Sequence, residues 1–264
     1  MSPDLYLAPS LIVKMAITAG FVLGATVAAE RAGPLVGGLV ATLPIGAGPV
    51  YVFLALDHDA HFIAQSAVAS LAINAVNVIF ATVYVLLAQR RSLFVSLSVG
   101  LVTWFALALV IHAVPWTVPT ALAMNVTVLC VCLWLVRPLR RVTMPPLRRR
   151  WFDLALRALL VALLVGVTVS LSFRIGPRGS GILAVFPVVL ISIMLILHPR
   201  VGGKPTAAVL ANAVLGLVGF ALATLVLHFA AEPFGLAVGL ALALATSIGW
   251  SLTVLAARRH GIAV

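Results

Sequence analysis

The sequence predicts an all-α, polytopic membrane protein with about nine transmembrane helices, arranged as two inverted four-helix repeats joined by one extra helix. Three observations lead to this fold class: the composition, the length of the apolar segments and an internal repeat. Of the 264 residues, 63% are hydrophobic and only 9% are charged, whereas soluble domains contain about 45–50% apolar and roughly 25% charged residues. A soluble fold could not hide this much apolar surface.

Continuously apolar segments account for most of the chain, and each is bounded by charged residues, Pro or Gly. Their length is close to the roughly 20 residues that an α-helix needs to cross a bilayer, and they lack the apolar and polar alternation of membrane β-strands. The first segment lacks the basic start of a secretory signal, so we expect it to be a membrane helix. The predicted helices span residues 10–30, 33–56, 62–88, 92–113, 118–136, 152–173, 178–198, 205–230 and 234–256.

The net charge of +11 is concentrated between the apolar segments and indicates their orientation. With the N-terminus outside and the C-terminus cytoplasmic, 14 of the 17 basic residues lie on the cytoplasmic side, which is the bias that membrane insertion favours. The exceptions are Lys14, Arg174 and Arg178. The basic segment 137–150 is expected to be a cytoplasmic hinge against anionic lipid headgroups, so nucleic acid is not an expected partner. The predicted location is a bacterial-type inner membrane, crossed several times.

An internal repeat sets the predicted domain organisation. The pattern R-x-G-P-x-x-x-G-x-x-A-x-x-P begins at Arg31 and again 143 residues later at Arg174, and a weaker match continues into the next helices. Helices one to four therefore correspond to helices six to nine. Because the unmatched fifth helix lies between the copies, the second copy must enter from the opposite side of the membrane. The predicted units are the first repeat over residues 1–113, a linker helix and basic loop over 114–150, and the inverted repeat over 151–264.

Inverted repeats are typical of secondary transporters, in which a two-fold axis in the membrane plane lets one fold open to either side. The second helix of each copy carries a proline near its middle, Pro44 and Pro187, and we expect both helices to kink or break there. Backbone groups freed at membrane depth are tolerated only against protein or a water-filled cavity. The two breaks therefore predict a binding site, with a packing kink between glycine-rich helices as the other explanation.

The candidate substrate-binding residues come from the two motifs and from the few polar side chains inside the predicted spans. Arg31 and Arg174 precede the broken helices, where positive charge favours an anion, and anchoring to lipid headgroups explains them equally well. Asn74 and Asn77 share one helix face, with interhelical hydrogen bonding as their alternative role. The full set is Arg31, Gly33, Pro44, Gly46, Asn74, Asn77, Arg174, Gly176, Pro187 and Asn212.

The densest polar cluster is the loop over residues 57–61, with the sequence Asp-His-Asp-Ala-His. Its histidines and carboxylates could collect a divalent cation, whereas a solvated loop in which Asp59 caps the next helix is the simpler interpretation. No nucleophile with a base, metal-ligand spacing or Walker-type loop occurs at membrane depth. We therefore predict no enzyme activity and no catalytic residue, bound metal or cofactor.

The leading predicted function is a secondary transporter or exporter of a small solute, with an anion among the candidates. The alternatives are a flippase for a phosphate-bearing lipid and a non-transporting accessory protein of an envelope or polysaccharide assembly. Membrane lipid and a small-molecule solute are the expected partners, and a homodimer is left open. The Gly-rich motif helix with its central proline resembles that of GlpM-like small bacterial inner-membrane proteins. This resemblance covers about one helix per repeat and implies an inner-membrane protein without indicating a substrate.

Overall fold

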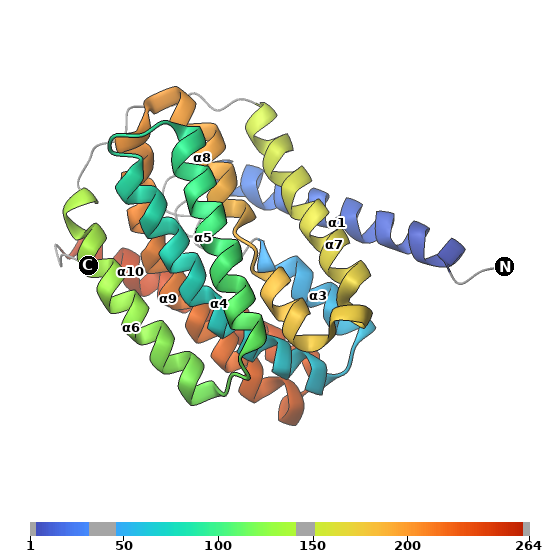
Figure 1. Ribbon diagram of the computed structural model, residues 1–264. Coiled ribbons are helices and arrows are strands. Elements are labelled where there is room, and N and C mark those ends of the chain that lie inside the picture. The colour runs from blue at the N-terminus through green and yellow to red at the C-terminus, as the bar shows by residue number, and fades with distance from the viewer. Residues whose placement is uncertain (1–3, 32–45, 141–150, 261–264) are drawn as a thin grey trace.

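The computed structural model describes residues 4–31, 46–140 and 151–260, and every regular element within these ranges is a helix (Figure 1). The predicted all-α class is therefore correct. The helices are α1 (Asp4–Arg31), α3 (Ala47–Asp57), α4 (Ala60–Leu87), α5 (Leu93–Ala113), α6 (Val118–Val136), the short 3-10 helix η1 (Arg137–Leu139), α7 (Trp151–Ala184), α8 (Val188–Val201), α9 (Gly203–Phe234) and α10 (Leu236–Arg259).

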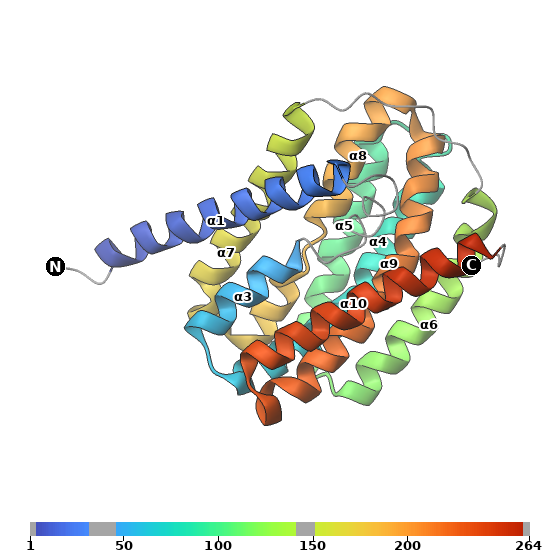
Figure 2. The ribbon, with the colours of Figure 1, turned by 180° about the vertical axis from the view of Figure 1, so that it is seen from behind.

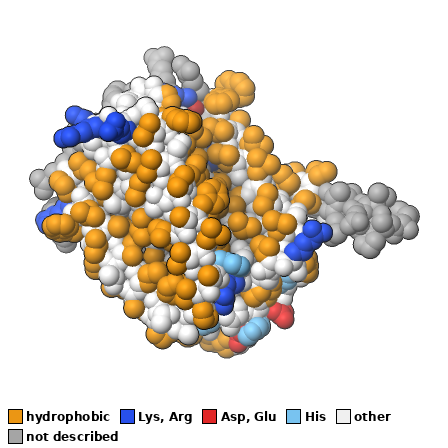
Figure 3. Space-filling view, in the orientation of Figure 1, with side chains coloured by type: hydrophobic (Ala, Val, Ile, Leu, Met, Phe, Trp, Pro, Cys, Tyr) orange, Lys and Arg blue, Asp and Glu red, His pale blue; other side chains and the backbone are white. Residues whose placement is uncertain are grey.

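Several helices are consistent with a multi-pass membrane protein. Within the described residues, 6 segments are long and apolar enough to cross a bilayer, and the longest of them, Trp151–Val201, contains both α7 and α8. Large apolar side chains point outward from the bundle; Phe94 is 80% and Leu109 72% exposed, and apolar side chains are spread across the face seen in Figure 3. The finer count of nine spans stays a prediction, since part of the second predicted helix lies outside the described residues.

The two ends of the bundle differ in charge. We call the end formed by residues 57–60, 113–118 and 234–236 the acidic end, because Asp57, Asp59 and Glu232 lie there or beside it. We call the end formed by residues 88–93, 136–140 and 201–203 the basic end. Its described arginines are Arg90, Arg91, Arg137, Arg140 and Arg200.

Helix α4 forms the centre of the fold. In the most apolar stretch of α4, 78% of the residues are buried, compared with 22% in the segment containing α6 and 17% in α10. Helices α5, α6, α7 and α9 all pack against α4, and α10 packs outside α9. On the face seen in Figure 2, α1, α3 and α10 lie in front of these inner helices. A helix that is apolar all round is suited to this fully buried position.

Two glycines allow the backbones of neighbouring helices to touch α4. A Cβ atom added to Gly181 of α7 would overlap the carbonyl oxygen of Ser66, and one added to Gly203 of α9 would overlap the carbonyl oxygen of Ala88. Small residues at such crossings permit the close packing that holds helices together where water is absent. The spacing of α4 from both neighbours therefore depends on these glycines.

Replacing Gly181 with alanine is expected to destabilise the protein strongly, because the added methyl group meets backbone rather than a movable side chain. Overpacking of this kind costs about 1–3 kcal/mol or more. The midpoint of thermal unfolding in detergent measures the effect. Gly216→Ala on α9 is the matched control, since nothing lies within 4 Å of the added Cβ atom. Equal unfolding midpoints for the two variants would contradict the proposed close packing.

Candidate functional site

The chain departs from helical geometry at two places, inside α7 at Gly176 and between α7 and α8 at Pro187. Gly176 has φ 66° and ψ −174°, a conformation that glycine alone adopts without strain. After this kink α7 continues to Ala184, and α8 begins at Val188, directly after Pro187. The break expected at Pro187 is therefore present, and the kink at Gly176 falls between the predicted helices 152–173 and 178–198.

Polar side chains of α4 bind carbonyl oxygens along the second limb of α7. Helix breaks leave backbone groups without their usual partners, and hydrocarbon cannot satisfy them. Here three side chains on one face of α4 donate hydrogen bonds to carbonyl oxygens that follow one another every four residues along the chain. They are Ser66 Oγ to the Pro177 oxygen (3.0 Å), Ser70 Oγ to the Gly181 oxygen (2.6 Å) and Asn77 Nδ2 to the Val185 oxygen (2.8 Å).

Two of these α4 side chains also bind aromatic residues from other helices. The hydroxyl groups of Tyr51 on α3 and Ser70 lie 2.6 Å apart, and Trp104 Nε1 on α5 donates to Asn77 Oδ1 at 2.7 Å. The Trp104 ring packs edge-on against Phe186, with ring centroids 4.8 Å apart. The break before α8 is therefore enclosed by α3, α4 and α5.

The starts of α3 and α8 lie against each other. A Cβ atom added to Gly46, which precedes α3, would lie 3.2 Å from Val189 Cγ2 and 3.8 Å from Val188 Cγ2. Gly46 follows the first motif proline by two residues, and Val188 directly follows Pro187. The start of α3, just after the first motif, thus meets the break of the second motif inside the bundle, and we take this crossing as the candidate site.

Asn74 belongs to a second polar cluster rather than to the crossing. Its Nδ2 atom donates to Asn125 Oδ1 (2.9 Å) and to the Leu217 oxygen (3.1 Å), and Asn125 in turn donates to the carbonyls of Leu71 and Ala121. These bonds fasten α6 and α9 to α4. The Asn74 Oδ1 atom is buried and has no partner among the described residues.

Of the remaining candidate residues that the structure describes, Arg174 and Asn212 lie away from the crossing. Arg174 is exposed on α7, which fits anchoring at a lipid headgroup better than contact with a buried solute. Asn212 on α9 donates to the carbonyls of Ala208 (2.8 Å) and Arg140 (3.3 Å), near the basic end. Arg31 is the last residue of α1, and its side chain, like Gly33 and Pro44, lies outside the described part of the structure.

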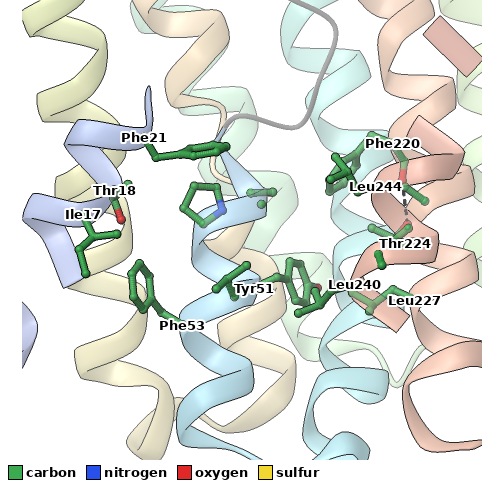
Figure 4. A pocket seen from close by; sticks show the side chains of 17 residues that line it. Ile17, Thr18, Phe21, Tyr51, Phe53, Phe220, Thr224, Leu227, Leu240 and Leu244 are labelled. Carbon is green, nitrogen blue, oxygen red and sulfur yellow. Dashed lines mark hydrogen bonds between the residues drawn. The ribbon is translucent and has the colours of Figure 1, made fainter. Parts of the chain in front are cut away.

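A cavity of about 410 Å³ lies beside the crossing, between α1, α3, α9 and α10 (Figure 4). Its mouth is bordered by Ile17, Phe21 and Leu244, which are 57%, 56% and 47% exposed. The hydroxyl groups of the lining residues Thr18 and Thr224 donate to carbonyls of their own helices, so the wall is almost entirely apolar. Sequence reasoning missed this cavity because its wall comes from four helices that are distant in the chain.

The loop over residues 57–61 has separate partners for each of its polar side chains. Asp59 caps α4 by accepting from the Phe62 amide at 2.8 Å, as the simpler interpretation expected. His58 lies 2.7 Å from Ser172 Oγ, and His61 lies 2.9 Å from the exposed Glu232. Among the described residues no group of three histidine, cysteine or acidic side chains is placed to hold a metal ion.

Comparison of the chain with protein-family models, with curated proteins and with solved structures finds no match. The resemblance to GlpM-like proteins is thus left as a prediction. What the protein does has to be inferred from its own geometry.

Replacing Asn77 with alanine is expected to lower stability by about 1–3 kcal/mol, because the Val185 carbonyl and the Trp104 indole would both lose a buried partner. Unfolding by detergent titration measures the loss. Thr127→Ala is the control, since the Thr127 hydroxyl is exposed and binds only the Ala123 carbonyl of its own helix. If both variants unfolded at the same denaturant concentration, Asn77 would have no role in holding the break.

Stability is expected to fall on acidification through His58. Burial lowers the pKa of His58 below its ordinary value, outweighing the nearby Asp57 and Asp59 carboxylates. The folded state therefore favours the neutral ring, and this contribution is complete above the unfolded pKa of about 6.5 and is lost as the pH falls toward the lowered value. Melting points between pH 8 and 5 test this. The His58→Asn variant should show a weaker pH dependence, and an unchanged dependence would refute the assignment.

Proposed function

We propose that the protein is a secondary transporter or exporter of a small solute, working by alternating access between two inverted four-helix repeats. The observation that carries this proposal is the crossing of α3 with α8, where Gly46 meets Val188 and Val189. Paired interrupted helices that meet inside a bundle are the usual construction of transporter binding sites. A purely structural bundle has no need for an interruption at the place where α8 meets the start of α3.

The contacts between helices support an inverted repeat. In the proposed correspondence α1 matches α7, α3 matches α8, α4 matches α9 and α5 matches α10. Helix α1 packs on α7, and α4 packs on α9, so these elements contact their own counterparts. Helix α5 contacts α8, and α10 contacts α3. Because α5 matches α10 and α8 matches α3, these two contacts are equivalent in the proposed repeat. A two-fold axis would produce these matching contacts, because it converts one contact into its counterpart in the other repeat.

The proposed orientation places the basic end in the cytoplasm and the acidic end outside. This choice follows the preference for Lys and Arg in short cytoplasmic loops of inner-membrane proteins. The described arginines at the basic end, such as Arg90 and Arg91, support it, as does the acidic and histidine-containing turn between α3 and α4 at the other end.

Solute movement in reconstituted vesicles tests the proposal. Vesicles containing the protein should carry a subset of a broad panel of labelled small anions and neutral solutes faster than empty vesicles. Val189→Trp should reduce this flux at least about tenfold, because the indole would fill the crossing, whereas Leu109→Trp is the control on a face that is 72% exposed. Arg31→Ala and Arg174→Ala test the predicted preference for anions. Flux equal to that of empty vesicles across the panel would exclude the transporter proposal.

A second candidate function, a flippase for a phosphate-bearing lipid, is favoured by the cavity. Its volume of about 410 Å³ falls in the range of roughly 300–1,000 Å³ that ligand pockets occupy. The exposed residues at its mouth lie along the sides of helices rather than at the ends of the bundle (Figure 4). An acyl chain could therefore enter laterally while the headgroup stayed near the crossing.

Reduction of a fluorescent phosphatidylglycerol in the outer leaflet of proteoliposomes distinguishes the two functions. A flippase would make nearly all of the probe accessible, compared with about half in protein-free vesicles, and Gly48→Phe should slow this exchange by filling the cavity. Gly20→Phe serves as the control, because Gly20 is exposed on α1 outside the cavity and, like Gly48, has nothing within 4 Å of an added Cβ atom. Protection of half the probe in all samples would exclude the flippase.

A further inference from the structure

Two ion pairs occupy opposite ends of the bundle. Lys14 Nζ on α1 binds both carboxylate oxygens of Asp57, at 2.7 and 2.5 Å, where α3 ends. Arg200 near the end of α8 makes two parallel hydrogen bonds to Asp153 in the first turn of α7, at 2.7 and 2.5 Å. The Arg200–Asp153 contact is bidentate, which makes it stronger and more directional than a single charged contact, whereas the Lys14 ammonium group is a point charge shared between the two oxygens of Asp57.

Both pairs are withdrawn from solvent, unlike the other ion pair of the described residues. The side chains of Lys14 and Asp57 are 17% and 22% exposed, and those of Arg200 and Asp153 are 22% and 7% exposed. The His61–Glu232 contact is 71% and 52% exposed. Exposed pairs contribute little to stability, whereas breaking a buried pair is costly unless water reaches the separated charges.

The two pairs occupy similar places in the proposed repeats, although Lys14 and Asp153 are 139 residues apart rather than 143. Each joins the first helix of a repeat to the end of its broken second helix. Asp57 and Arg200 are separated by the same 143 residues as the two motif copies. The signs of the charges are reversed between the two pairs. The carboxylate Asp57 lies at the end of the second helix of the first repeat, whereas the cation Arg200 lies at the end of the second helix of the other repeat.

The pairs also close opposite ends of the molecule. Asp57 lies at the acidic end, three residues before α4 starts, and Arg200 lies at the basic end, where Gly203 touches Ala88 just after α4 stops. The 28 residues of α4 separate the two ends, a distance of about 42 Å at about 1.5 Å per residue. Lys14 further lies 6.0 Å from the centroid of Phe53, a residue that lines the cavity.

From these observations we infer that Lys14–Asp57 and Arg200–Asp153 are the two gates of the transport cycle, which open in turn at the external and the cytoplasmic side. The inference rests on the proposed transporter function. With both pairs formed, one pair closes each end of the molecule, as in an occluded state. Opening toward one side separates one pair, whose charges are then hydrated by the entering water, while the other pair keeps the opposite end closed.

Side-specific labelling of a buried cysteine tests the gates without any need for a known solute. The reporter is Ala184→Cys, fully buried at the end of α7 beside the break, in a background where Cys130 and Cys132 are alanine. A membrane-impermeant maleimide is applied to right-side-out and inside-out membrane vesicles. Lys14→Gln should raise the labelling rate from the outside, and Arg200→Gln from the cytoplasmic side. We expect about a tenfold increase, the effect of losing roughly 1.4 kcal/mol of stabilisation.

Matched variants keep the test decisive. Asp57→Asn and Asp153→Asn should open the same gates from the carboxylate side, in case a cation variant fails to fold. The exchanged pair Lys14→Asp with Asp57→Lys should restore slow labelling. Glu232→Gln breaks only the exposed pair and should change nothing.

The outcomes separate the gates from the transport function. Labelling that is unchanged, or raised equally from both sides, would overturn the gate assignment and leave the pairs as structural contacts. Vesicles that carry no solute while labelling remains side-specific would instead overturn the proposed transport and retain the two gated conformations.

Discussion

Backbone carbonyl groups along an interrupted helix must find partners within the protein, because hydrocarbon offers none. In this fold Ser70 and Asn77 of α4 supply partners for the Gly181 and Val185 carbonyls near the break before α8, and much of the architecture follows from that requirement. Helix α4 has to run alongside α7 at backbone contact, which Gly181 permits. A helix that carries such polar groups must also be shielded from lipid on its other sides, and α5, α6 and α9 provide this cover.

Much of the helical architecture could be predicted from the sequence, because apolar run length and loop composition are local properties. The segment 62–88 lies within two residues of α4, and 118–136 has the same bounds as α6. The break at Pro187 was predictable for the same reason, since proline removes a backbone donor wherever it occurs. Gly176 was singled out as a motif residue, but nothing in the pattern indicated that it would adopt a positive φ.

The candidate site was less predictable, because it depends on which helices meet. Asn77 was identified, and its alternative role as an interhelical hydrogen-bonding group is the one found. The heptad-related positions Ser70, Asn77 and Tyr84 of α4 carried a periodic signal that could have marked the face toward α7 and α8. Tyr51 and Trp104 carried no such signal, because aromatic residues in an apolar helix are common and their partners lie on other helices.

The glycine contacts of α4 divide the molecule into stiff and compliant parts. Where two backbones touch, as at Gly181 and Gly203, no layer of side chains remains that could deform, so the contacts of α4 with α7 and α9 are stiff at these two points. Helix α1 is attached differently, since the flexible side chain of Met15 lies between it and Gly166 of α7. The contact between α1 and α7 is therefore more compliant than the backbone contacts of α4, and α1 borders the cavity and carries one member of an ion pair.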